Sequence, residues 1–326
     1  MRDYQYQSVF APEISGYISE MRSVGYKFER AAEDLSRFDR FCQEQGCANP
    51  VLDRETVESW CRKRSHESAR THVRRISPVR GLARFIIKTG GHAYVAPSQN
   101  SKIDRYSHQP YIFTEDEIKR LLCACDSFAL SPVSPRRHIV MPMAIRLIYG
   151  CALRISEAAH LAVGDVDLDN ATLTIKDTKF NKSRIVPIAQ GLACRCRHYA
   201  HDLLKGKPGD YPFFPSNRGC FYHRDAIYVF FRQSLHKAGI PHSGCGPRVH
   251  DLRHSAACRC LMNWVRAGKD ITNALPYLSA YLGHEDLRGT QHYLRLTAEM
   301  YPDIISAVEK SCAWMIPEVT DHVETN

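Results

Sequence analysis

Residues 249–294 constrain this chain most, because they set chemically specific side chains in a fixed order. The stretch begins with Val-His-Asp-Leu-Arg-His at 249–254, continues with Leu-Gly-His at 282–284, and reaches Tyr293 nine positions later. A tyrosine phenol, with an ordinary pKa of about 10, attacks poorly at neutral pH. It needs a nearby proton acceptor and cations that hold an anionic phosphate. The histidines and the arginine supply both, which indicates an enzyme that breaks a phosphodiester with a tyrosine nucleophile.

Two upstream motifs extend this set. Gly-Cys-Ala-Leu-Arg-Ile-Ser-Glu at 150–157 adds Arg154, and Thr-Lys-Phe-Asn-Lys at 178–182 adds Lys179 in an expected hairpin. Across residues 111–315 the order Arg, Lys, His-x-x-Arg, His, Tyr resembles that of the tyrosine recombinase (phage integrase) family, including its Xer-type enzymes. The resemblance implies a site-specific DNA recombinase or integrase that works through a 3′-phosphotyrosine intermediate, with no cofactor and no metal.

The nucleophile and the phosphate-binding residues follow from this resemblance. Tyr293 is the expected nucleophile, and Tyr301 is the alternative. Arg154 and Arg253 are expected to hold the non-bridging oxygens of the scissile phosphate, because a guanidinium binds phosphate through two parallel hydrogen bonds. Glu157, three residues after Arg154, is expected to orient that arginine. A simple surface ion pair between these two residues is the alternative.

The proton-transfer residues complete the expected site. Lys179 is the general acid for the departing 5′ oxygen, with Lys176 and Lys182 as alternatives. His250 takes or returns the tyrosine proton, because its ordinary pKa of about 6.5 permits both near neutrality. His284 hydrogen-bonds the phosphate or orients the tyrosine. Acidic residues do not cluster around this set, so the sequence predicts no metal site and no cofactor.

The net charge of +9 is concentrated in one stretch. Residues 62–105 hold eleven lysines and arginines and two acids, so the rest of the chain is balanced. A basic stretch of this kind is typical of a polyanion partner, although a solvated charged face is the simpler interpretation. Together with the catalytic motifs it favours double-stranded DNA. The candidate DNA-binding residues are Arg70, Arg74, Arg75 and Arg84.

Cysteines and hydropathy indicate the compartment. No stretch has the roughly 18 uncharged apolar residues of a membrane helix, and the first residues lack the apolar core of a signal peptide. We therefore expect a cytoplasmic protein without membrane contact, whose thirteen cysteines are reduced thiols. Three Cys-x-Cys pairs lie in helix-like segments, where such residues point apart, so they are not expected to bind metal.

The sequence predicts a mainly α fold with a small antiparallel β-sheet. The first ninety residues have helical apolar spacing, with Asp53 as a helix cap and Pro78 kinking or splitting the fourth helix. They form an expected helical domain, residues 1–105 with a linker from about 90, similar to the core-binding (SAM-like) domain of the family. Three short apolar alternations between 166 and 188 predict strands within a catalytic domain at 106–326.

Assembly is also implied by the resemblance. Inverted half-sites would bind a homodimer, and two sites would synapse as a homotetramer, with a second recombinase as an alternative partner. Residues 298–315 form an expected helix that docks into a neighbouring protomer or packs on its own domain. No separate arm-binding domain is expected before Ser8. The alternative functions are a type IB topoisomerase-like relaxing enzyme and a catalytically silent DNA-binding accessory protein.

Overall fold

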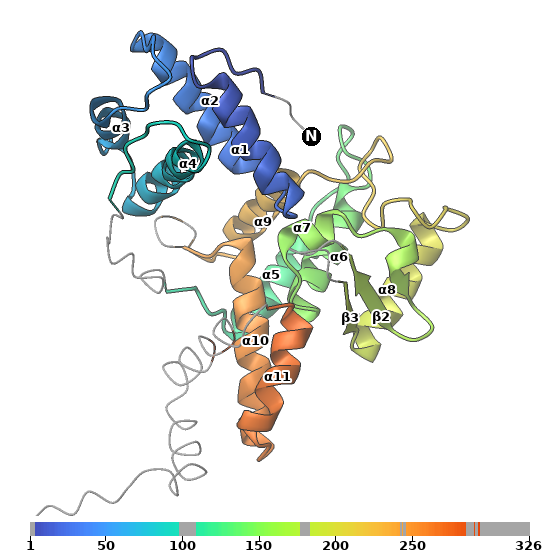
Figure 1. Ribbon diagram of the computed structural model, residues 1–326. Helices are drawn as coiled ribbons and strands as arrows, with labels where there is room; N and C mark the ends of the chain where they lie inside the picture. The colour runs from blue at the N-terminus through green and yellow to red at the C-terminus, as the bar shows by residue number, and fades with distance from the viewer. Residues whose placement is uncertain are drawn as a thin grey trace, which may run out of the picture. The chain divides into compact units, whose positions relative to one another are not determined.

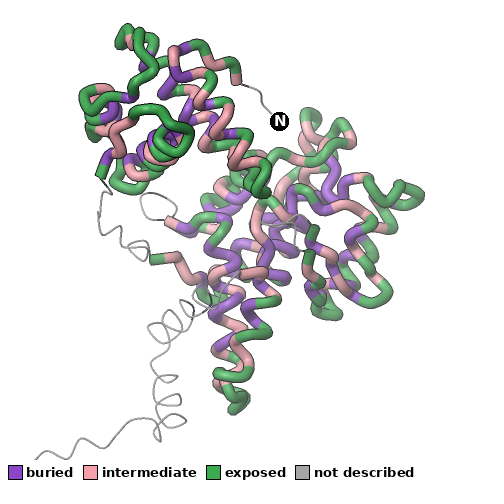
Figure 2. Tube along the Cα trace, in the orientation of Figure 1, coloured by how far each residue is buried: buried purple, intermediate pink, exposed green. Residues whose placement is uncertain are grey.

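The computed structural model describes residues 4–97, 109–176, 183–241, 243, 246–284, 290 and 293. Within them the chain is mainly helical with one small antiparallel sheet, which confirms the expected fold class (Figure 1). The chain divides into two compact units, Met1–Gln109 and Pro110–Asn326. Each unit has a hydrophobic core of its own, seen as buried residues inside each unit (Figure 2). No helix in the described ranges is long and apolar enough to cross a membrane.

The described part of the first unit, residues 4–97 and 109, contains four helices. They are α1 (Ala11–Ser23), α2 (Glu29–Glu44), α3 (Arg54–Cys61) and α4 (Ala69–Lys88). Side chains cap two of them: Asp53 accepts from the Thr56 amide at 2.7 Å, and Ser68 accepts from the Thr71 amide at 3.1 Å. Apolar residues from all four helices, including Trp60, form the core between them.

Helix α4 decides one sequence expectation and corrects another. Pro78 was expected to kink or split this helix, and the split is excluded because Pro78 lies inside one continuous 20-residue helix. Arg75 is only 5% exposed, so it does not share the exposed face that carries Arg70, Arg74 and Arg84. The reason is helical periodicity, because positions 75, 79 and 82 form a single stripe that faces the core. Arg75 is therefore removed from the candidate DNA-binding residues.

The second unit holds the remaining elements. They are α5 (Glu115–Asp126), α6 (Arg137–Gly150), α7 (Ile155–Ala159), the 3-10 helix η1 (Val163–Asp165), β1 (Val166–Asp167), β2 (Thr172–Ile175), β3 (Arg184–Pro187), α8 (Gln190–Leu203), α9 (Arg224–Lys237), α10 (Val249–Arg266) and α11 (Ile271–Leu282). The strand order is β1-β2-β3, antiparallel throughout, with Leu173 paired to Val186. Thr114 and Glu117 form the capping box that starts α5.

Three packing contacts in this unit bring the elements that carry the site residues together. The apolar helix α6 is buried almost along its whole length and packs against α10, which runs beside α11 (Figure 1). Strand β3 packs against α11. Between α6 and α7 the chain turns at Ala152, whose φ of 49° is left-handed and therefore uncommon for a residue with a side chain. These contacts bring the ends of α6, α10 and α11 and the start of α7 together.

Candidate active site

The structure places five of the six candidate catalytic residues close to one another. They come from the start of α7, from α10, from the turn after α11 and from position 293: Arg154, His250, Arg253, His284 and Tyr293. Lys179 and its alternative Lys182 lie outside the described residues, as do Tyr301 and the segment 298–315. Lys176 directly follows β2, and its ammonium forms an ion pair with Asp165.

Glu157 lies between two arginines. Arg154, the N-cap residue of α7, donates to Glu157 Oε1 at 2.7 Å, and its amide donates to Oε2 at 2.8 Å. Arg184, at the start of β3, donates to both carboxylate oxygens at 2.9 Å. Burial favours the protonated carboxyl, but the hydrogen bonds from Arg184 and Arg154 dominate and lower the pKa of Glu157 to about 2. The carboxylate therefore stays ionised and fixes both guanidinium groups.

Arg184 is a site residue that the sequence argument did not identify. Its only signal in the sequence is a charged residue at the start of a strand whose other residues, Ile-Val-Pro, are apolar. Its partner Glu157 is 27 residues away, and its Nε donates to the Tyr281 carbonyl at 2.9 Å, 97 residues away. Neither separation follows any helix or strand period, so only the folded chain reveals the contacts.

Gly283 ends α11 and leaves space for the Arg184 side chain, which hydrogen-bonds Glu157. Its φ is 65°, and a Cβ built on it would lie 2.9 to 3.1 Å from the Arg184 guanidinium and Cδ. Both the backbone conformation and the close approach therefore require glycine. The Gly283 carbonyl accepts from Arg154 at 3.0 Å, so the Leu-Gly-His turn contacts both arginines and sets the position of the next residue, His284.

Arg253 is the most deeply buried cation of the site, with 1% of its surface exposed. It donates to the Ala152 carbonyl at 2.8 Å and to the Leu282 carbonyl, so it ties the α6–α7 turn to the end of α11. The left-handed conformation of Ala152 belongs to that turn. Burial lowers the pKa of Arg253 to about 10, and the neighbouring Tyr293 opposes that shift. The guanidinium is charged at neutral pH.

Tyr293 is 2% exposed and is surrounded by these cations and by imidazole rings. Its ring lies parallel to that of His284, at 5.9 Å between centroids and 10° between planes, and 5.4 Å from His254. The His254 ring is in turn 4.6 Å from that of His250. Burial raises the pKa of the Tyr293 phenol, whereas the charge and hydrogen bond of Arg253 lower it. The resting phenol is therefore neutral, and its reaction requires a proton acceptor.

Both histidines of the expected set are neutral at physiological pH. Loss of solvation around each ring, followed by the charges of Arg253 and Arg154, lowers the pKa of His250 and of His284 to about 4. The Nδ1 atom of His284 lies 2.9 Å from the Thr290 hydroxyl. A neutral imidazole has one unprotonated nitrogen, so either ring has the capacity to accept a proton.

These depressed pKa values predict how stability depends on pH. In the unfolded chain the two histidines titrate near 6.5, whereas His250 and His284 in the folded protein titrate at about 4. The unfolded chain therefore binds more protons between these values, and the free energy of unfolding should fall as pH drops from 6.5 towards 4. Above pH 6.5 these groups should contribute no slope.

Urea denaturation at pH 7 and pH 5 measures this effect. The double variant His250→Gln/His284→Gln should lose less stability between the two pH values than the parent protein. The other titrating groups are common to both proteins, so they cancel in the comparison. An equal loss in the variant and in the parent would contradict the prediction.

The described residues contain no group of three histidine, cysteine or acidic side chains arranged to hold a metal ion. Arg154, Arg184 and Arg253 instead bring three positive charges around the one carboxylate of Glu157. A site with this charge excess attracts an anion, and planar guanidinium groups suit phosphate oxygens in particular.

Comparison with known proteins agrees with this chemistry. Residues 112–300 match the model of the phage integrase family. The protein y4rB of Sinorhizobium fredii is 29% identical over 93% of this chain and 98% of its own length. The tyrosine recombinase XerD of Neisseria meningitidis is 34% identical over 59% of this chain and 60% of its own length.

A solved structure shares the fold. The XerH site-specific recombinase, bound to a palindromic difH substrate in a post-cleavage complex, superposes with a TM-score of 0.61. It is 18% identical and covers 88% of this chain and 79% of its own. The family model spans more than half of the chain, and Arg154, His250, Arg253, His284 and Tyr293 lie together in the fold. The chain belongs to the phage integrase family, the tyrosine recombinases.

Proposed function

We propose that this tyrosine recombinase cuts and rejoins double-stranded DNA at specific sites through Tyr293. The phenol oxygen attacks the scissile phosphorus and forms a phosphotyrosine bond on the 3′ side, while the bond from phosphorus to the 5′ oxygen breaks. His250 accepts the phenol proton, and Lys179 donates a proton to the departing 5′ oxygen. Rejoining reverses these steps, with a 5′ hydroxyl from the same or another strand as the attacking group. The phosphotyrosine conserves the bond, so no external energy source is required.

The arginines stabilise the charge that develops during this transfer. Arg154 and Arg253 would hold the non-bridging phosphate oxygens, which gain negative charge in the transition state. Glu157 and Arg184 keep Arg154 in place, since all three are joined by hydrogen bonds of 2.7 to 2.9 Å. Fixed donors cost no reorganisation when the charge develops. His284, beside the tyrosine ring, would orient the phenol or hydrogen-bond the phosphate.

One observation carries the proposal: a buried phenol lies at the centre of a site with excess positive charge. Arg253 hydrogen-bonds Tyr293, and the pKa of His250 and of His284 is lowered to about 4. Such a site is unfavourable when empty and becomes favourable when a phosphate supplies the missing negative charge. A tyrosine with a purely structural role needs neither the cations nor the neutral imidazoles.

DNA binding and assembly extend the proposal. The exposed residues Arg70, Arg74 and Arg84 of α4 would contact the phosphate backbone. The palindromic substrate of XerH supports inverted half-sites. The lambda integrase dimer on a core site and tetramer on a Holliday junction support a homodimer on one site and a homotetramer for two joined sites. A second recombinase in the tetramer remains the alternative to four identical chains. Residues 298–315 would provide the contact between protomers.

Covalent capture tests the proposal and identifies the target site in the same experiment. The protein is incubated with fragments of its host chromosome, denatured with detergent, and the DNA that remains attached is sequenced. A recombinase should mark discrete inverted repeats, and two copies of such a repeat in one plasmid should yield deletion or inversion products. Relaxation without exchanged products would indicate a topoisomerase. Binding without any covalent adduct would indicate an accessory protein.

A further inference from the structure

The segment between α3 and α4 carries the densest positive charge of the first unit. Residues 62–66, Arg-Lys-Arg-Ser-His, are all exposed, and we refer to them as the basic loop. Within the part of the chain that the structure describes, Arg62, Lys63 and Arg64 form no ion pair with an acid. Arg62 is near enough to Glu58 to help lower the pKa of that carboxyl, but three adjacent cations still repel one another, and a polyanion would relieve that repulsion.

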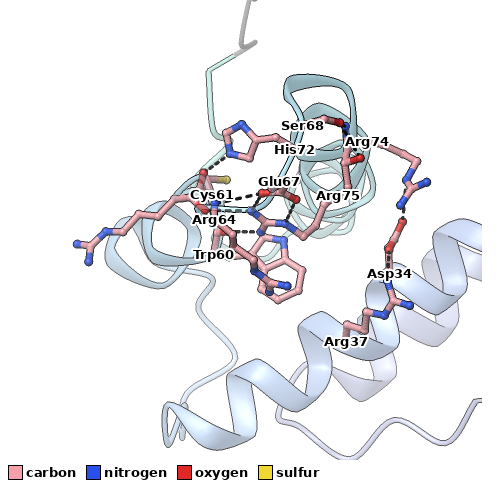
Figure 3. Close-up of polar contacts among 12 residues, drawn as sticks. Asp34, Arg37, Trp60, Cys61, Arg64, Glu67, Ser68, His72, Arg74 and Arg75 are labelled. Atoms are coloured by element: carbon pink, nitrogen blue, oxygen red, sulfur yellow. Dashed lines mark hydrogen bonds and ion pairs between the residues drawn. The ribbon is translucent and has the colours of Figure 1, made fainter. Parts of the chain in front are cut away.

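A buried ion pair holds the backbone beneath this loop (Figure 3). Arg75 of α4 donates to the two Glu67 carboxylate oxygens at 2.8 and 2.9 Å, to the Arg62 carbonyl at 3.0 Å and to the Trp60 carbonyl. Its side chain is 6% exposed and that of Glu67 is 4% exposed. The hydrogen bonds from Arg75 lower the pKa of Glu67 to about 2, so the pair stays charged.

Further contacts fix the same segment. Glu67 Oε2 accepts from the Arg64 amide at 3.3 Å, and the Glu67 amide donates to the Arg64 carbonyl at 3.1 Å. His72 bonds the Cys61 carbonyl at 2.6 Å. Hydrogen bonds thus hold the loop backbone at its beginning, middle and end, while its cationic side chains are exposed to solvent.

The energetics of this pair indicate a positioning role. Burying an arginine and a glutamate costs desolvation, and an apolar pair of similar volume is often equally stable or more so. The attraction between the two charges therefore adds little to stability that leucine or methionine would not supply. What an apolar pair lacks is the set of hydrogen bonds to the Trp60, Arg62 and Arg64 backbone. Those bonds give the loop one conformation before any ligand binds.

We infer that the basic loop is a preformed phosphate-binding element that holds the DNA backbone, and that the Arg75–Glu67 pair keeps it in its binding conformation. The inference rests on the proposed function as a DNA recombinase. Exposed arginine and lysine side chains are the usual phosphate ligands. A loop that is already ordered loses little conformational entropy when it binds. Arg75 thus serves DNA binding from beneath the surface and does not contact the phosphate itself.

Salt dependence measures the phosphate contacts directly. Each neutralised phosphate contributes about 0.9 to the slope of log affinity against log salt for duplex DNA. The triple variant Arg62→Gln/Lys63→Gln/Arg64→Gln should therefore reduce that slope by about 2 to 3. A matched triple on the second unit, Lys205→Gln/Lys207→Gln/Arg218→Gln, removes the same charge from exposed positions and should leave the slope unchanged. Fluorescence anisotropy with a labelled duplex between 50 and 200 mM salt gives both slopes.

The outcomes separate this inference from the function on which it rests. A parental slope in the loop triple, or an equal decrease in both triples, would overturn the loop assignment while the recombinase proposal stands. A wild-type protein that binds no DNA would overturn both. At low salt and saturating protein, the loop triple should still form the Tyr293 adduct, because its catalytic residues are intact.

A second variant tests the role of the buried pair. Glu67→Leu/Arg75→Met keeps the volume and all three loop cations but removes the hydrogen bonds to the loop backbone. The folded variant should bind DNA about tenfold more weakly, which corresponds to about 1.4 kcal/mol. It should also unfold at a lower urea concentration than the parent, because the Trp60 and Arg62 carbonyls lose their donor. Unchanged affinity of the folded variant would show that the pair does not position the loop.

Discussion

Replacing Tyr293 with phenylalanine should abolish the covalent protein–DNA adduct. The substitution removes only the hydroxyl, so the ring should keep its contacts with His254 and His284 and the buried position that it occupies. Without the phenol oxygen no bond to phosphorus forms, and the neighbouring groups have nothing to activate. A nicked suicide substrate carrying the captured site, resolved on a denaturing gel, measures the adduct. We expect it to fall below detection, while binding of the uncleaved duplex is retained.

Tyr281→Phe is the matched control. Tyr281 is a half-buried tyrosine near the same residues, and its contact with Arg184 runs through the backbone carbonyl, which the substitution leaves in place. This variant should form the adduct at the parental rate. An adduct that persists in Tyr293→Phe would move the nucleophile to another tyrosine, Tyr301 first. Adduct loss in both variants would indicate damage to the fold.

Replacing Arg253 with glutamine should slow cleavage by about 10²- to 10³-fold, the usual effect of removing one fixed donor to a developing oxyanion. The side chain is buried at the centre of the site and bonds the Ala152 and Leu282 carbonyls. Its loss therefore removes charge beside the tyrosine and leaves two buried acceptors short of a donor. Each unsatisfied group costs about 1 to 3 kcal/mol, so the variant should also unfold at a lower urea concentration.

Single-turnover cleavage at saturating protein separates the two effects, because only folded, DNA-bound protein is counted. Arg253→Lys keeps the charge but lacks the planar fork, so it should recover only part of the rate. Arg259→Gln is the control on the same helix, since Arg259 is 28% exposed and faces Glu115 at 3.7 Å. If Arg253→Gln cleaves at the parental rate, Arg253 is a structural residue and the phosphate is held elsewhere.

Local signals in the sequence predicted the helix ends and the strand pairing well. Asp53 caps α3 and the Thr114–Glu117 box starts α5, because capping involves residues only three apart in the chain. The apolar alternation that predicted three strands corresponds to β1, β2 and β3. At Pro78 the sequence left a kink or a split open, and the split is excluded because α4 continues through the proline.

Contacts between distant segments could not be predicted in this way. Arg74 is exposed and Arg75 is buried, because successive residues of a helix point in different directions. The charge of residues 62–105 does not distinguish the two, and so Arg75 was counted among the candidate DNA-binding residues. Arg184 was missed for a related reason, as its partners Glu157 and Tyr281 lie on α7 and α11.

The sequence by itself determined which chemical groups are present and in what order, which was enough to identify the family. The identity and order of the residues are the same in any fold, because folding does not change the covalent chain. Only the tertiary structure decided which of those groups lose water and which partners they meet. Desolvation and hydrogen bonding depend on neighbours that are far away in the chain, and they set the charge state of His250, His284 and Glu157.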